Sequence, residues 1–111
     1  MNKSDTSADL AASASQAAEF LRLMANENRL AILCALIERA RSVGELGDLL
    51  GLSQPNVSQH LAKLKSLQLV SAARAGTTIR YSLASRDVAQ IIAILHRRYC
   101  APAGVRRRRA A

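Results

Sequence analysis

The second half of this 111-residue chain almost lacks acidic side chains. Asp87 is the only Asp or Glu in residues 51–111, which hold eleven Lys and Arg residues and so carry a formal charge of +10. Residues 1–50 hold seven acidic and five basic residues, a balance of −2 that brings the chain to its net +8. Positive charge gathered in one half favours an anionic partner, with nucleic acid first and an acidic membrane second.

Other scarcities exclude whole classes of protein. The longest apolar run, Leu30 to Ile37, is far shorter than the roughly 20 residues that span a bilayer, so no membrane-spanning helix is expected. The first residues hold no apolar signal segment, which favours a cytoplasmic location. The two cysteines, Cys34 and Cys100, do not make a disulfide scaffold and are expected to be reduced thiols in the cytosol.

Capping residues and apolar spacing predict a mainly α-helical chain with one small β-hairpin. Five helices are expected, with N-terminal caps at Ser13, Asn26, Ser42, Ser53 and Ser85. The hairpin consists of residues 69–70 and 78–83 with its turn at Gly76, and it precedes the last helix. A chain of this length forms one domain.

The domain is expected to span residues 13–102, between a disordered tail at 1–12 and a basic disordered tail at 103–111. Apolar residues recur at helical spacing in the first two helices, and in the second they form a single apolar stripe. In the first helix they are Ala14, Ala17, Ala18, Leu21 and Met24, and in the second Leu30, Leu33, Cys34 and Ile37.

The third and fourth predicted helices are joined by Gly51-Leu52-Ser53, a connection short enough for a helix-turn-helix motif. The basic hairpin that follows has the position of a wing. The order ααααββα therefore predicts a winged helix-turn-helix domain.

The fourth helix has the polarity that a DNA-recognition helix needs, with polar side chains off its apolar stripe of Val57, Leu61 and Leu64. Candidate DNA contacts are Gln54, Asn56, Ser58 and Gln59 to bases, Lys63 and Lys65 to phosphates, and Arg74, Thr77 and Arg80 on the wing. Two other interpretations stay open. One is a solvated polar helix in an ordinary α+β domain, and the other is a nonspecific nucleoid or membrane-surface binder whose affinity collapses with salt.

Over about residues 17–100 the chain resembles the ArsR/SmtB family of winged-helix repressors. The resemblance is carried by LMANENRLAIL at residues 23–33, SVGEL at 42–46 and LSQPNVSQHL at 52–61. It implies a homodimer joined through the first and last helices. Such a dimer binds double-stranded DNA at a palindromic operator and places its two fourth helices about 34 Å apart, one DNA turn.

Metal sensing is not the expected switch. Family members that sense soft metals carry a Cys pair on the helix equivalent to residues 43–50, which here contains no Cys. Members that sense zinc or nickel at the last helix use Asp, His and Glu ligands, of which only Asp87 and His96 are present. No metal site and no cofactor are predicted. An alternative that stays open is a zinc or arsenite site made of Cys34, Cys100 and His96.

The placement of the two cysteines resembles the dithiol subgroup of this family that includes the BigR and SqrR repressors. The resemblance implies that reactive sulfur species or oxidants link Cys34 and Cys100 through a disulfide or a chain of sulfur atoms. Arg97, Arg98 and His96 favour a thiolate at Cys100, whereas apolar neighbours disfavour one at Cys34, so Cys100 is expected to attack first.

Two less specific interpretations of the cysteines compete with the dithiol switch. Both residues also suit a role as small buried apolar side chains. An enzyme of thiol exchange is not expected, since the chain has neither a Cys-x-x-Cys motif nor a nucleotide-binding loop.

Overall fold

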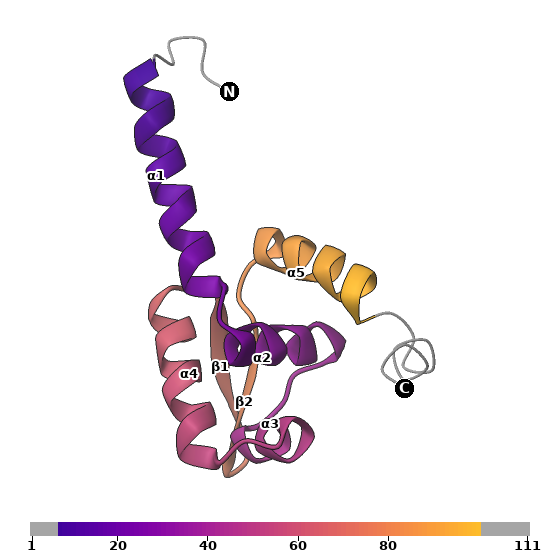
Figure 1. Cartoon of the computed structure of the whole chain (residues 1–111). Helices are drawn as coiled ribbons and strands as arrows, with labels where there is room; N and C mark the ends of the chain where they lie inside the picture. Colours follow the sequence, from indigo (N-terminus) through magenta and orange to yellow (C-terminus); the bar gives the residue numbers. More distant parts are fainter. Residues whose placement is uncertain (1–6, 101–111) are drawn as a thin grey trace.

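The computed structural model describes residues 7–100 as five α-helices and one two-stranded sheet (Figure 1). The helices are α1 (Ser7–Met24), α2 (Glu27–Glu38), α3 (Val43–Leu50), α4 (Gln54–Ser66) and α5 (Arg86–Tyr99), and the strands are β1 (Val70–Ala75) and β2 (Thr78–Leu83). This is the predicted winged helix-turn-helix order. No helix in this part of the chain combines the length and the apolar character needed to cross a membrane.

Four helices begin at the capping residues that the sequence predicts. The side chains of Asn26, Ser42, Ser53 and Ser85 each accept a hydrogen bond from the backbone N–H three residues later. Such a cap stabilises a helix by about 0.5–2 kcal/mol. At the other end of α3, Gly51 adopts a left-handed conformation with φ of 70°. Helix boundaries in the DNA-binding half of the domain are therefore encoded locally.

The first helix begins earlier than predicted. α1 begins at Ser7 and not at Ser13, so residues 7–12 of the predicted tail are helical; the alanine-rich sequence there has high helix propensity. Of the apolar residues that recur at helical spacing only Met24 is buried, and Leu21 has 55% of its surface accessible. Figure 1 shows the reason: α1 projects away from the rest of the described chain. Residues 1–6 and 103–111 of the predicted tails lie outside the described residues.

The second helix is the centre of the core. α2 contacts α3, α4, α5 and β2, and its Ile32, Leu33, Ala35 and Leu36 are buried. Of the predicted apolar stripe only Leu33 is fully buried, while Leu30, Cys34 and Ile37 are half-buried. The buried surface of α2 extends beyond that stripe because the helix packs against neighbours on several sides.

The wing is a regular antiparallel hairpin that is fastened to the helices at its base. β1 and β2 pair from Val70–Leu83 to Ala75–Thr78, and Gly76 has a φ of 68° in the turn. An isolated bridge joins Arg41 to Tyr81 of β2, with N–H to carbonyl distances of 3.0 and 2.8 Å. The segment that leads into α3 is thus bonded directly to the wing.

Candidate DNA-binding surface and dithiol pair

All six predicted contacts on α4 are exposed: Gln54, Asn56, Ser58, Gln59, Lys63 and Lys65. Val57, Leu61 and Leu64 are buried beneath them, as predicted. By helical spacing, Asn56, Gln59 and Lys63 share one side of the helix, so two amides precede a lysine along it. Amides pair with the edge of adenine in the major groove, and lysines pair with phosphates.

A close backbone contact at Gly47 sets how α3 meets α4. The Gly47 carbonyl accepts hydrogen bonds from the N–H groups of Gly51 and Leu52, at 2.8 and 3.0 Å. Gly47 itself is buried, and a Cβ built on it would lie 2.8 Å from the carbonyl oxygen of Leu52. Only glycine lets the turn between the two helices of the motif pass this close to α3.

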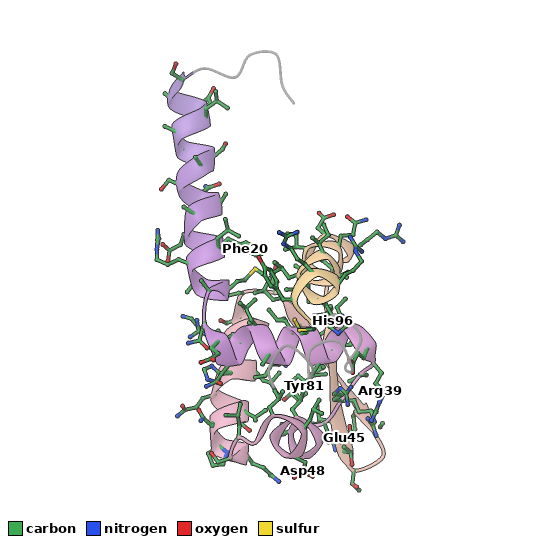
Figure 2. The ribbon with its side chains drawn as sticks, turned by 45° about the vertical axis from the view of Figure 1, so that its right-hand side comes forward. Phe20, Arg39, Glu45, Asp48, Tyr81 and His96 are labelled. Atoms are coloured by element: carbon green, nitrogen blue, oxygen red, sulfur yellow. The ribbon has the colours of Figure 1, made fainter. Side chains whose placement is uncertain are left out.

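The predicted wing contacts divide into two kinds. Arg74 and Thr77 are exposed near the turn, where they are available to a DNA backbone. Arg80 instead points to α3, with its Nη1 2.9 Å from Oε1 of Glu45. Figure 2 shows Glu45 and Arg39 near the wing strands. Arg80 therefore connects the wing to α3, and a DNA contact from it stays a prediction.

Glu45 holds the start of α3 together. Its Oε1 accepts a hydrogen bond from the backbone N–H of Ser42 at 2.9 Å, and its own N–H donates to Oγ of Ser42 at 3.1 Å. The Ser42 N–H, with the nearby guanidinium groups of Arg80 and Arg39, lowers the pKa of the Glu45 carboxyl. This capping box orients α3, and with it the motif, relative to the wing.

The two cysteines come together between α2 and α5. Both side chains are half-buried, and they lie close enough for Cys100 to act on the pKa of the Cys34 thiol. Burial, then the adjacent Cys100 and then the charge of Glu38 raise the pKa of the Cys34 thiol from 9.0 to about 11. Cys34 is therefore neutral at physiological pH, which agrees with the apolar setting expected for it.

A contact between a histidine and a glutamate lies one helical turn from the cysteine pair. Nε2 of His96 on α5 is 3.4 Å from Oε2 of Glu38 on α2, and Figure 2 shows His96 above α2. Within residues 7–100, no three His, Cys, Asp or Glu side chains gather closely enough to hold a metal ion. His96 lies against Glu38 in this structure, and the alternative metal site of Cys34, Cys100 and His96 stays a prediction.

Comparison with known proteins identifies the family. Residues 26–72 match the model of the arsR family of bacterial regulatory proteins. The transcriptional activator HlyU of Vibrio cholerae is 47% identical over 85 residues, which are 77% of this chain and 79% of that protein. The chain belongs to the arsR family. It is therefore a DNA-binding transcriptional regulator, and the exposed side chains of α4 and the wing form its candidate DNA-binding surface.

Solved structures of arsR-family relatives have the same fold. Reduced HlyU from Vibrio cholerae matches with a TM-score of 0.77 and 43% identity, covering 83% of this chain and 97% of that one. The repressor BigR from Xylella fastidiosa matches with a TM-score of 0.79 and 33% identity, covering 86% and 95%. A homodimeric winged helix-turn-helix DNA-binding domain from Mycobacterium bovis matches with a TM-score of 0.69 and 33% identity, covering 86% and 87%.

Sequence reasoning missed several residues that organise this arsR-family site. The Ser-x-x-Glu spacing of Ser42 and Glu45 is a local signal for a capping box and was available. The contact of Glu45 with Arg80 joins residues 35 positions apart and has no local signal. Glu38 lies four residues after Cys34, yet its role emerges only when α5 is placed beside α2.

Proposed function

We propose that this regulator is a homodimeric repressor that leaves its palindromic operator when Cys34 and Cys100 become covalently linked. The inducer is a reactive sulfur species or an oxidant. The observation that carries the proposal is the contact between two half-buried thiols from α2 and α5. The protein acts by binding DNA, with no turnover of a substrate.

A homodimer joined through α1 and α5 is supported by where apolar surface is left exposed. Seven large apolar side chains are exposed within residues 7–100, and five of them lie on these two helices: Leu10, Leu21, Ile91, Ile94 and Tyr99. Exposed apolar surface of this kind marks interaction sites. The Mycobacterium bovis relative is homodimeric.

The thiol chemistry follows from the unequal surroundings of the two cysteines. A Cys100 thiolate attacks the outer sulfur of a polysulfide, which forms Cys100–S–SH and releases a polysulfide one sulfur shorter. Cys34 then loses its proton to solvent and attacks the sulfur of Cys100, which forms the Cys34–Cys100 bond and expels hydrosulfide. The two thiols lose two electrons, and the departing sulfur atom gains them. Attack in this order suits the high pKa of Cys34, because the thiolate is the nucleophile.

The covalent link lowers DNA affinity through the dimer interface. It ties the end of α5 to α2, and α5 is one of the two helices on which the dimer depends. A shifted interface changes the spacing of the two α4 helices from the one-turn separation, about 34 Å, that successive half-sites require. A coupling of about 1–3 kcal/mol between link and DNA, or 5- to 150-fold in affinity, is typical of such switches.

The test treats the reduced protein in parallel with polysulfide, peroxide and a panel of metal ions, and reads intact mass and operator affinity for each. Loss of affinity together with a two-proton mass loss or added sulfur atoms is the expected result. Cys34→Ser should bind the operator like the reduced wild type and keep that affinity after polysulfide. Release of Cys34→Ser by polysulfide, or release of the wild type by a metal ion alone, would contradict the proposal.

A further inference from the structure

Glu38 contacts both the helix that carries Cys100 and the segment that leads into the DNA-binding motif. Along α2 it lies one turn after Cys34, and its Oε2 is 3.4 Å from Nε2 of His96. His96 lies one turn before Cys100 on α5, and its carbonyl accepts the N–H of Cys100 at 2.7 Å. The Glu38–His96 pair is therefore a second connection between α2 and α5, beside the two cysteines.

The other carboxylate oxygen of Glu38 is bonded to Arg41. Nη2 of Arg41 donates to Oε1 of Glu38 at 2.6 Å, and Nε of Arg41 donates to the carbonyl of Ala35 at 2.9 Å. The Arg41 side chain is only 10% exposed, whereas that of Glu38 is 52% exposed. An arginine this buried is costly without an acidic partner, so Arg41 keeps Glu38 in place.

Arg41 in turn positions both DNA-binding parts of the domain. Its backbone exchanges two hydrogen bonds with Tyr81 of the wing strand β2. The next residue, Ser42, is the N-cap of α3 and forms the capping box with Glu45. A displacement of Arg41 therefore moves the base of the wing and the start of the helix-turn-helix together.

We propose that Glu38 is a positioning residue that transmits the state of the Cys34–Cys100 pair to the wing and α3 through Arg41. The inference rests on the proposed function. Linking the cysteines draws the end of α5 toward α2. His96 moves with it because His96 and Cys100 are four residues apart and lie on the same side of the helix. The changed His96 contact displaces Glu38, whose other oxygen is held by the buried Arg41. Glu38 itself touches neither DNA nor the bond that forms between the cysteines.

The test compares operator affinity in the reduced and the linked protein, for the wild type and for Glu38→Gln. Glutamine keeps an oxygen to accept the Arg41 hydrogen bond, but an amide NH2 group replaces the accepting oxygen that faces Nε2 of His96. We expect Glu38→Gln to bind the operator within about twofold of wild type when reduced, and intact mass to show complete linking. The loss of affinity on linking should fall from the wild-type value, about 5- to 150-fold, to under about threefold.

Glu27→Gln is the matched control. Glu27 is exposed at the start of α2, about three turns before Glu38 on the same helix, and the variant makes the same change of charge. It should keep the wild-type ratio of reduced to linked affinity. If this control lowers the ratio of the two affinities, net charge and not the Glu38 contact sets the coupling. That result would overturn the inference.

A second variant guards against loss of folding in the first. His96→Ala removes the other partner of the same contact and should lower the ratio to the same extent. The double variant should be no lower than either single one, because residues that act through one contact are not additive. The inference is overturned if Glu38→Gln loses affinity equally in both states, or if its ratio equals that of wild type. If the wild type itself keeps its affinity when linked, the proposed function fails first.

Discussion

A methyl group added to Gly47 would lie 2.8 Å from the carbonyl oxygen of Leu52. The clash is with backbone, which a side-chain rotation cannot relieve. We therefore expect Gly47→Ala to lower the free energy of unfolding by about 1–3 kcal/mol, the usual cost of overpacking, and to weaken DNA binding because the α3–α4 angle changes. Urea unfolding followed by circular dichroism measures the first effect.

Gly44→Ala is the control in the same helix. A Cβ there meets nothing nearer than Nε2 of Gln54 at 3.8 Å, an ordinary contact. Since alanine is the better helix former, this variant should be equal to wild type or up to about 1 kcal/mol more stable. Equal stability of the two variants would contradict the steric explanation.

The raised pKa of Cys34 predicts how the reduced protein responds to alkali. The folded chain holds the Cys34 proton up to about pH 11, whereas an unperturbed thiol releases it near 9.0. The unfolded chain therefore binds fewer protons in this interval, and the stability contributed by neutral Cys34 is lost as pH rises through it. Alkylation of Cys34 by iodoacetamide should still be accelerating above about pH 10, where a free cysteine with a pKa of 9.0 has nearly levelled off.

Cys100→Ser sharpens this measurement because it removes the adjacent thiol that helps to raise the pKa of Cys34. The alkylation profile of Cys34 should move toward lower pH in this variant and stop short of the ordinary value, since burial remains the largest cause. In the wild type at neutral pH, peptide mapping should find Cys100 alkylated before Cys34. Faster labelling of Cys34 would reverse the proposed order of attack.

Gln59 and Lys63 share one side of α4, and their substitutions should affect DNA binding differently: one its sequence specificity, the other its overall affinity. If Gln59 pairs with a base, Gln59→Ala lowers the preference for the operator over random DNA by about 1–3 kcal/mol. Lys63→Ala should weaken binding to the operator and to random DNA alike. It should also reduce the slope of log affinity against log salt by about one. Fluorescence anisotropy at several salt concentrations measures both. If Gln59→Ala lowers affinity equally for the operator and for random DNA, Gln59 contacts the DNA backbone and not a base.

Arg74 and Arg80 form a second contrasting pair, on the wing. Arg74→Ala should lower affinity for every DNA and reduce the salt slope by about one, because Arg74 is exposed near the wing turn. Arg80→Ala should act first on stability, since Arg80 pairs with Glu45. The folded state lowers the pKa of Glu45, so its contribution to stability is present above pH 4.5 and is lost as pH falls through the lowered value.

Acid titration of stability tests the role of Arg80. Without it, the pKa of Glu45 moves back toward 4.5, and less stability is lost on acidification. Arg74→Ala, which leaves Glu45 untouched, should follow the wild-type acid profile. Identical acid profiles for all three proteins would show that the Arg80–Glu45 contact contributes nothing measurable.

The sequence predicts features whose causes are local. Four helix caps form through hydrogen bonds within three residues, at Asn26, Ser42, Ser53 and Ser85. Gly51 ends the first helix of the motif. The start of α1 was placed wrongly at Ser13 because a Ser-x-x-Gln signal competes there with alanine-rich helix propensity, which prevails.

Contacts between distant segments were beyond the sequence pattern. The burial of α2 on several sides depends on four neighbours that periodicity does not reveal. The contact of Cys34 with Cys100 was implied by the family resemblance alone, since nothing in either local sequence points to the other cysteine. Glu38 between His96 and Arg41 is likewise visible only after α5, α2 and the segment before α3 are assembled.

The projecting part of α1 has a thermodynamic consequence. All side chains of residues 7–19 are exposed in the single protomer, and a helix of this length is marginal in water without packing. In the proposed dimer a second chain supplies its order, so that assembly and folding of this segment are one equilibrium. The melting temperature should therefore rise with protein concentration, and dilution should reduce helix content before the core around α2 unfolds.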